Sequence, residues 1–505
     1  MLDILICIIP KINPYSPTVG PAILKAHLMQ SGFSCNVVDF NIQLFKALKA
    51  KGAEDQYYTN DIVFRKTIFT YSKRLEYTKE FIDFYNKYEY VFLNWIDFIK
   101  EKNPKWLGLS LMSLHSENVA IKLSQLVREH LPHIKIVWGG PGAGSPGFRY
   151  KKIKLIDHYI YGDGEESLIE LLKGNLSYSG IDSIKPNQVS SMDNLLVPNY
   201  DDINWDEYEN SDYMVTQNLI YVTGSRGCVK RCNFCDVYLQ WPEYQYRSGK
   251  HIAKEIIELK QKYNRKTFKF TDSLVNGSMK SFNELLYELI EIRKNDTDLN
   301  WHSQWIIRTK SKNPEKDVEH FRLIKESGCG FLEIGLESSV ERIRFQMNKK
   351  ITDEDVWWCL ELLNKFQISH VLLMIVGYPT ETEEDHQSTL NFIQKLYDKG
   401  WNKTTALSFN QILYIDKNTP MYDIFKDDPN FVTYKVWDGY IWKYKDNDFE
   451  TRVRRFKEVN ELIKKLNFPK LWGWVADSKH DYHEQLIEQE KYLKLEQSIK
   501  QDTLP

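Results

Sequence analysis

Short apolar runs alternate with helical stretches along most of this chain, and this alternation constrains the fold more than any other feature. Residues 2–9 form a continuous apolar run, a loop with proline and glycine follows, and a helical pattern covers about 21–31. A second apolar run lies at 37–40. A strand, a helix and a strand in this order predict a parallel sheet with helices on its faces.

The same alternation continues after a long interruption. Residues 41–103 have helical spacing and are rich in Lys, Tyr, Phe and Glu, which predicts a helical insertion. The sheet then resumes, with strands expected at 106–112, 134–138 and 159–161 and helices at 117–130 and from about Glu165. We therefore expect an open, doubly wound Rossmann-like sheet in residues 1–178, with its ligand crevice at the carboxyl ends of the strands.

A second series of strands and helices follows a loop-like segment. Residues 179–216 lose periodicity and contain Pro186 and Pro198, as an interdomain linker does. Residues 217–425 are expected to form a partial (β/α)6 barrel, with strands at 219–223, 267–271, 301–307, 331–336, 370–376 and 405–413. Residues 426–505 are expected to be helical, including a charged helix at about 484–500, and their tryptophans (Trp437, Trp442, Trp472 and Trp474) are expected mainly to pack in the core.

Charge and hydropathy exclude several classes of protein. Lys and Arg number 67 against 69 Asp and Glu, so the net charge of −2 provides no global attraction to nucleic acid or anionic membranes. We find no evident basic nucleic-acid-binding module, and no apolar run reaches the roughly 20 residues that span a bilayer. Because Asp3 and Pro10 are atypical of a signal peptide, a cytoplasmic location is expected.

Three of the seven cysteines lie within eight residues, directly after the first strand of the second series: Cys228, Cys232 and Cys235. Three converging thiolates can hold three irons of a [4Fe-4S] cluster and leave the fourth iron open. A zinc site or buried free thiols are the alternatives, but structural zinc usually needs four ligands and no second pair is evident nearby. Cys329 and Cys359 have apolar neighbours and are expected to be buried and inert.

The spacing Cys-x3-Cys-x2-Cys, with Phe234 before the last cysteine, resembles the motif of the radical S-adenosylmethionine (SAM) superfamily. In that family the open iron chelates SAM, and the reduced cluster cleaves it to a 5′-deoxyadenosyl radical. An external one-electron donor such as flavodoxin or ferredoxin is implied. Segments 270–273, 301–308, 328–338 and 377–382 resemble later strands of the family's barrel, and the resemblance assigns SAM binding to Phe234, Asp272, Gln304, Arg308, Glu337 and Ser338. Alternatively, acidic residues at strand ends cap the following helix.

The N-terminal region resembles the cobalamin-binding domain of one large radical SAM class. The matching residues are Thr18, Val19, Gly20, Ser110, Ser113, Gly139, Gly140, Pro141, Gly162, Gly164 and Glu165. Their glycines would let the backbone approach the nucleotide tail, although glycines after strands are common in all doubly wound domains. The segment 10–20 contains no histidine, so bound cobalamin is expected to be base-off without a histidine ligand.

Two such cofactors in one chain resemble the class B radical methylases. The resemblance implies that cob(I)alamin accepts a methyl group from one SAM, while a second SAM supplies the radical that activates the substrate carbon. We therefore expect a methyltransferase acting on an unactivated carbon. A cyclisation, ring contraction or other radical rearrangement is the main alternative, and a non-catalytic iron–sulfur binding or redox-sensing protein is another. A methylthiotransferase fits less well, because that family has three N-terminal cysteines where this chain has Cys7 and Cys35.

Overall fold

The computed structural model describes residues 1–54, 57, 67–69, 75–143, 147, 150–208, 218–409, 412–433 and 442–469. The chain divides into two compact units. The first unit consists of Met1–Arg226 and Leu239–Thr271, and the second of Gly227–Tyr238 and Asp272–Pro505. Within the described residues, no helix combines the length and apolar character that a membrane span requires.

The first unit is built on a five-stranded parallel sheet with the order β2-β1-β5-β6-β7. Its strands are β1 (Leu2–Ile8), β2 (Cys35–Asp39), β5 (Pro104–Ser110), β6 (Lys135–Gly139) and β7 (His158–Tyr159). Ile8 lies beside both Asp39 and Ser110, and Ser110 lies beside Gly139, so these strands end together. This strand order reverses direction between β1 and β5, and such a reversal opens a crevice at the carboxyl ends of the strands.

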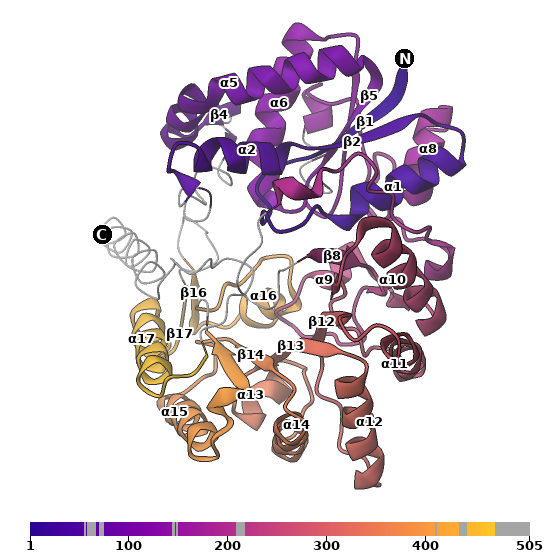
Figure 1. Cartoon of the computed structure of the whole chain (residues 1–505). Coiled ribbons are helices and arrows are strands. Elements are labelled where there is room, and N and C mark those ends of the chain that lie inside the picture. Colours follow the sequence, from indigo (N-terminus) through magenta and orange to yellow (C-terminus); the bar gives the residue numbers. More distant parts are fainter. Residues whose placement is uncertain are drawn as a thin grey trace, which may run out of the picture. The chain divides into compact units, whose positions relative to one another are not determined.

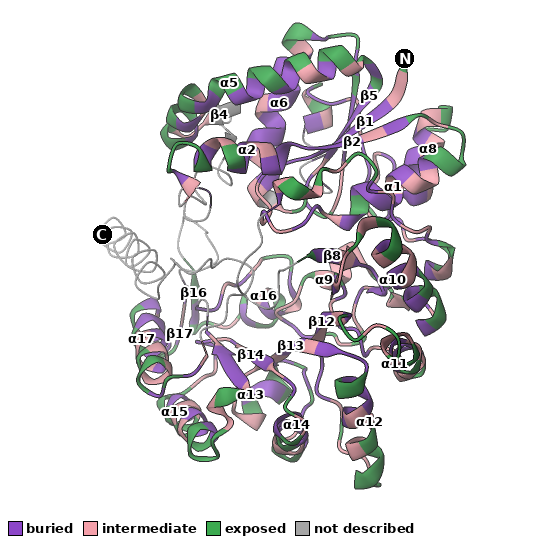
Figure 2. Cartoon of the chain, viewed as in Figure 1, coloured by how far each residue is buried: buried purple, intermediate pink, exposed green. Residues whose placement is uncertain are grey.

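Helices cover both faces of this sheet (Figure 1). Alternate residues of β1 point to opposite faces, as the two-residue period of a strand requires. Leu5 and Cys7 pack with α2, α5 and α6, whereas Ile4 and Ile6 pack with α1 and α8. The helices are α1 (Val19–Gln30), α2 (Phe40–Lys49), α5 (Lys79–Lys102), α6 (Glu117–His130) and α8 (Glu165–Lys173). Figure 2 shows the exposed residues of α5 on the side away from the sheet.

The segment expected to be a helical insertion also contains strands. Besides α2 and α5, it forms a short antiparallel pair of β3 (Thr67–Phe69) and β4 (Leu75–Tyr77). Both strands consist largely of β-branched, aromatic or leucine residues, which favour extended backbone, but each is too short to produce a clear pattern in the sequence.

The six strands expected between 219 and 413 are all present, and all pair in parallel within their units. The first unit holds the pair β8 (Leu219–Val222) and β11 (Thr267–Phe270), together with α10 (Gly249–Tyr263) and the antiparallel pair β9 (Ser225–Arg226) and β10 (Gln245–Tyr246). The second unit holds β12 (Asn300–Trp305), β13 (Cys329–Glu337), β14 (His370–Met374) and β15 (Thr405–Ser408), in sequence order. The mixed α/β fold with parallel sheets is thereby confirmed, while the closure of a partial barrel stays a prediction.

Helices and a small antiparallel pair complete the second unit. The helices are α11 (Met279–Arg293), α12 (Pro314–Glu326), α13 (Glu341–Gln346), α14 (Asp353–Lys365), α15 (Glu383–Asp398), α16 (Pro420–Phe425) and α17 (Phe449–Lys465). The short α9 (Val237–Gln240) follows the cysteines, and the boundary between the two units falls within it, between Tyr238 and Leu239. The C-terminal region, expected to be helical, also contains the pair β16 (Phe431–Thr433) and β17 (Trp442–Tyr444). Trp442 is fully buried, whereas Trp437, Trp472, Trp474 and the helix expected at 484–500 lie outside the described residues.

Candidate active site

The three clustered cysteines lie on a short loop that opens the second unit. Cys232 is buried and Cys228 and Cys235 are partly exposed, and all three are free thiols. The loop is folded tightly: the Lys230 backbone N–H donates to Cys228 Sγ at 3.3 Å, and the Cys235 N–H donates to the Cys232 carbonyl at 3.2 Å. Sulfur ligands on so short a loop suit iron–sulfur chemistry.

A second group of possible metal ligands lies elsewhere in the second unit. In the described part of the chain, Glu383, His386 and Glu458 bring three possible ligand atoms within 4.8 Å of one another.

Burial and nearby cations act in opposite directions on the thiols. Burial raises the pKa of Cys228 and Cys232, and it raises the pKa of Cys235 to about 11. The positive charge of Lys349 partly offsets this for Cys228 and Cys232. Because metals bind thiolates, loading this loop must release protons, and Lys349 favours that release.

Lys349 links the cysteine loop to β13. Its Nζ lies 2.7 Å from Glu337 Oε1 and 6.0 Å from the centre of the Phe234 ring. Both charged side chains are largely buried, and a Cβ at position 335 would lie 2.5 Å from Glu337 Oε1 and 2.9 Å from Lys349 Nζ. Gly335 thus makes the room that this ion pair occupies. Lys349, which sequence reasoning missed, thus lies near both Phe234 and Glu337, whose assignment to SAM stays a prediction.

The other predicted SAM-binding residues lie elsewhere along the second unit. Asp272 is buried just after β11, and Gln304 lies on β12 beside Glu333. Arg308 donates to the carbonyls of Asn276 and Gly277, the latter at 2.6 Å, so backbone carbonyls engage its guanidinium. The Ser338 hydroxyl accepts the Val340 N–H at 3.2 Å. Their assignment to SAM stays a prediction.

The residues predicted to bind cobalamin lie at or follow the carboxyl ends of β1, β5, β6 and β7 along the first unit. Some of them are available for a ligand. Thr18 Oγ1 is buried and has no partner among the described residues, and Cβ atoms at Gly20 and Gly139 would meet nothing within 4 Å. Val19 is buried in α1, Ser110 ends β5, and Pro141 is exposed. An unsatisfied buried hydroxyl and open glycines at a crevice are compatible with a large bound cofactor.

Other residues of that predicted set serve the protein's own packing. A Cβ at Gly140 would lie 2.5 Å from the Leu111 carbonyl, and one at Gly162 would lie 2.1 Å from the Asn187 carbonyl, where both glycines have positive φ. Gly164 precedes α8, and the Ser113 hydroxyl accepts the His115 N–H at 3.2 Å. These contacts explain the glycine pattern without a ligand.

Glu165 is likewise occupied within the first unit. It is 4% exposed and lies 2.5 Å from Arg226 Nη2, while Asp163 lies 2.8 Å from Arg226 Nη1. Burial alone would raise the pKa of Glu165, but Arg226 holds it below its ordinary value. This ion triad connects the loop before α8 to β9, the strand just before the cysteine loop. Sequence reasoning missed Arg226 because its partners lie about 60 residues away.

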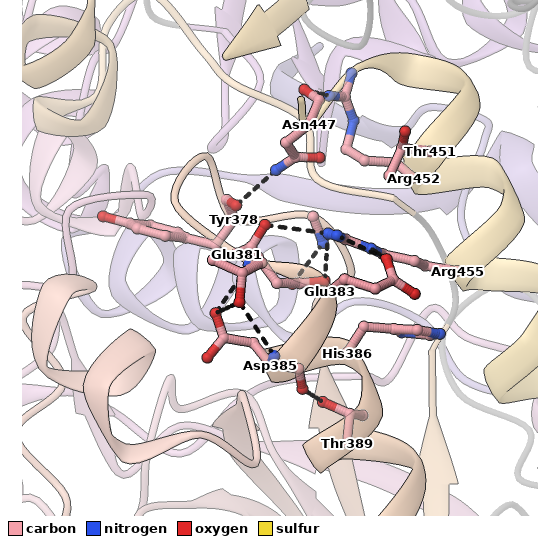
Figure 3. A network of polar contacts seen from close by, with 12 residues as sticks. Tyr378, Glu381, Glu383, Asp385, His386, Thr389, Asn447, Thr451, Arg452 and Arg455 are labelled. Carbon is pink, nitrogen blue, oxygen red and sulfur yellow. Dashed lines mark hydrogen bonds and ion pairs between the residues drawn. The ribbon is translucent and has the colours of Figure 1, made fainter. Parts of the chain in front are cut away.

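The candidate metal group Glu383, His386 and Glu458 is already neutralised by arginines. Arg454 contacts Glu383 at 2.6 Å and Glu458 at 2.8 Å, and Arg455 contacts Glu383 at 3.2 Å. Figure 3 shows Arg455 reaching the carboxylates at the start of α15. We interpret this group as an ion-pair network that fastens α17 to α15, since two guanidinium groups disfavour a cation there.

Comparison with known families identifies the second series of strands. Residues 222–393 match the model of the Radical SAM superfamily. The chain carries a radical SAM enzyme domain. This domain contains the cysteine loop, Glu337 and Lys349, and it covers about a third of the chain.

Two solved structures resemble nearly the whole chain. The cobalamin-dependent SAM radical enzyme OxsB, with aqua-cobalamin and SAM bound, has a TM-score of 0.65 at 15% identity, covering 98% of this chain and 71% of OxsB. The radical SAM methyltransferase TsrM from Kitasatospora setae, with tryptophan and a SAM analogue bound, has a TM-score of 0.59 at 14% identity, covering 98% of this chain and 99% of TsrM. At these identities the likeness establishes the shared fold.

Sequence relatives point to several reactions. An uncharacterized methyltransferase of Pyrococcus horikoshii is 24% identical over 59% of this chain and 66% of its own length. An anaerobic magnesium-protoporphyrin IX monomethyl ester cyclase of Rubrivivax gelatinosus is 24% identical over 60% of this chain and 55% of its own. A tRNA-2-methylthio-N(6)-dimethylallyladenosine synthase of Buchnera aphidicola is 30% identical over 37% and 43%. The chain thus matches less than two thirds of the length of these relatives.

Proposed function

We propose that this protein is a cobalamin-dependent radical SAM methyltransferase that acts on an unactivated carbon. The observation that carries the proposal is the joint presence of a radical SAM domain with a free, three-cysteine loop and a doubly wound sheet whose strand order reverses between β1 and β5. OxsB and TsrM, which share this fold over 98% of the chain, support the combination of the two parts.

Within this proposal, the chain's own residues bind and orient the reacting groups. Cys228, Cys232 and Cys235 would hold a [4Fe-4S] cluster, which when bound with SAM supplies a 5′-deoxyadenosyl radical. Lys349 holds Glu337 beside the loop and compensates the negative charge of the thiolates. Fixed side chains around the loop would orient the reactants.

In the first unit, the crevice at the ends of β1, β5 and β6 would hold cobalamin. Thr18 would offer its unpartnered hydroxyl, and Gly20 and Gly139 would allow close approach of the backbone. A base-off state without a histidine ligand is expected, because His27 Nε2 already accepts the Leu196 N–H at 3.1 Å and the segment 10–20 has no histidine. An external one-electron donor such as flavodoxin or ferredoxin is required by the chemistry.

The test is anaerobic reconstitution of the full chain with iron, sulfide and hydroxocobalamin. We expect about four irons and one cobalt per chain after desalting, 5′-deoxyadenosine formation on reduction with SAM, and a substrate mass increase of one methylene group. Cys232→Ala should abolish 5′-deoxyadenosine formation, while Cys359→Ala, at a buried position outside the loop, serves as the matched control. Iron without cobalt would contradict the role of the first unit, and a chain without iron would contradict the whole proposal.

A radical cyclisation or rearrangement is the second candidate function, favoured by the match to the Rubrivivax cyclase. It predicts 5′-deoxyadenosine formation with a product that gains no methyl group, so the same product analysis separates the two. Methylthiotransfer is less well supported. Cys7 and Cys35 lie buried on β1 and β2, so neither is placed to hold a second cluster.

A further inference from the structure

Asn233, between Cys232 and Phe234, is fixed at four points. Its backbone N–H donates to the Met347 carbonyl at 3.1 Å, and its carbonyl accepts the Met421 N–H at 2.8 Å. Its side-chain Nδ2 donates to the Gln346 carbonyl at 2.8 Å and to the Tyr378 hydroxyl at 2.9 Å. Asn233 is only 5% exposed. The middle of the cysteine loop is therefore held by the end of α13, the loop after β14 and the start of α16.

Tyr378 is the one of these partners that contacts Asn233 through its side chain. Its hydroxyl donates to the Gln346 carbonyl at 3.1 Å while it accepts from Asn233, so one phenol joins two backbone segments. Its ring is 2% exposed and packs against Phe425. Phe234, next to Asn233, packs against the same apolar cluster. Apolar packing thus shields these hydrogen bonds from water, which strengthens them.

The C-terminal segment in turn holds Tyr378. Asn447 Nδ2 donates to the Tyr378 carbonyl at 2.8 Å, a contact visible in Figure 3. Arg452, which is fully buried, donates to the Asn447 carbonyl at 3.0 Å and to the Trp442 carbonyl at 2.8 Å. A Cβ at Gly377 would lie 2.2 Å from Arg452 Cδ, so the loop after β14 and this arginine fit only with glycine.

A second arginine fixes the same loop from its other end. Glu381 Oε2 accepts the Gly377 N–H at 2.9 Å, and Arg455 lies 3.2 Å from Glu381 Oε1. Arg455 is only 4% exposed. Two buried arginines of α17 therefore support the short stretch that presents the Tyr378 hydroxyl to Asn233, and Figure 3 shows both arginines beside it.

We propose that Asn233 and Tyr378 are positioning residues that hold the cysteine loop in the geometry its metal group needs, with Asn447 and Arg452 as their support. The proposal rests on the proposed role of the three cysteines as ligands. A loop whose ligand geometry is held in advance loses less conformational entropy on loading, and its cluster dissociates more slowly. The C-terminal region, beyond residues 222–393, thereby contributes to the stability of the cluster.

The test compares Tyr378→Phe and Asn233→Ala with the wild-type full chain after anaerobic reconstitution. Tyr444→Phe is the matched control, because it also removes one phenol hydrogen bond, to Asp428 at 3.0 Å, from the second unit. The readouts are iron per chain, the first-order rate at which the visible absorption bleaches with a chelator in excess, and the unfolding midpoint of the apo-protein.

We expect bleaching to be about fivefold faster in Tyr378→Phe and about tenfold faster in Asn233→Ala, since each lost hydrogen bond changes an equilibrium by about these factors. Tyr444→Phe should bleach at the wild-type rate. The double variant Tyr378→Phe/Asn233→Ala should bleach faster than Asn233→Ala, but by less than the product of the two single effects, because both changes remove the shared Asn233–Tyr378 contact while only Tyr378→Phe removes the bond to the Gln346 carbonyl.

Bleaching at the wild-type rate in both single variants would overturn the positioning role while leaving the proposed function intact. Faster bleaching that merely follows a lowered apo-protein midpoint, with an additive double variant, would also overturn it, since that pattern describes general destabilisation. A wild-type chain that takes up no iron would instead overturn the ligand assignment, and this inference with it.

Discussion

Lys349 interacts electrostatically with one carboxylate and two cysteine thiols in the second unit. Its ammonium pairs with Glu337 and carries the positive charge felt by the thiols of Cys228 and Cys232. Glu337 itself has a φ of 67°, a left-handed conformation that is uncommon for a residue with a side chain. A buried ion pair contributes little net stability, and residues with unusual backbone conformations occur most often at functional sites.

Lys349→Met is expected to lower the free energy of unfolding of the apo-protein by about 3 kcal/mol, because it leaves the Glu337 carboxylate buried without its partner. The double variant Lys349→Met/Glu337→Gln, which removes both charges, should lose less unfolding free energy than Lys349→Met. Urea denaturation measures both. Lys350→Met changes the exposed neighbouring lysine and should shift stability by less than about 0.5 kcal/mol. A loss of unfolding free energy below about 0.5 kcal/mol in Lys349→Met would contradict this expectation.

Gly20 allows stability and cobalamin binding to be separated at one residue. It lies in the first turn of α1, exposed, and a Cβ there would meet nothing within 4 Å. Gly20→Ala should therefore raise the free energy of unfolding of the apo-protein by about 0.5 kcal/mol. If cobalamin approaches this backbone, the same variant should retain at least about tenfold less cobalamin after desalting. Ala26→Ser, farther along α1, is the control, and wild-type retention in Gly20→Ala would remove Gly20 from the site.

At the scale of elements, the sequence predicted those parts whose pattern is local. The helix expected at 117–130 is α6, and the apolar run at 2–9 is β1, because periodicity and burial coincide there. The pair β3–β4 was missed because three-residue strands leave no periodic signal. Lys349 was missed because a lysine in a polar run resembles a solvated residue. The partners of Asn233 could not be predicted, since Tyr378 is 145 residues away and only tertiary packing brings the two together.

His370, on β14, should make the stability of the second unit depend on pH. Burial lowers its pKa from 6.5 to about 4, and its Nδ1–H donates to the Ile368 carbonyl at 2.9 Å. The unfolded chain therefore binds a proton between pH 6.5 and 4 that the folded chain does not. The stability that comes from keeping His370 neutral and buried is thus complete above pH 6.5 and is lost as the pH falls toward 4.

His370→Gln should reduce the slope of unfolding free energy against pH in that window by about 1.4 kcal/mol per pH unit, which corresponds to one proton. Chemical denaturation of the apo-protein at several pH values between 4.5 and 7 gives the slope. His251→Gln, at an exposed imidazole, controls for the loss of a ring. An unchanged slope in His370→Gln would show that His370 binds its proton equally in both states.

At the scale of the whole molecule, the cysteines divide into two classes. Cys7, Cys35, Cys329 and Cys359 are each no more than 6% exposed, two in each unit, and each lies on a strand or helix. Burial raises the pKa of all four, that of Cys35 to about 12. The loop cysteines are the ones available to ligands, whereas the other four can report on opening of the cores that surround them.

A thiol reagent added to native apo-protein should thus react in two phases. Up to three thiols should react rapidly, Cys228 and Cys235 before the buried Cys232, and the remaining four at least about a hundredfold more slowly, because they become accessible only when a unit opens. All seven should react in denaturant. Cys228→Ala should reduce the number of rapidly reacting thiols by one, and Cys359→Ala the number of slowly reacting thiols by one. Reconstitution with iron and sulfide should abolish the rapid phase and leave the slow phase unchanged. More than three rapid thiols would contradict the burial of these four cysteines, and an unchanged rapid phase after iron uptake would place the iron away from the loop.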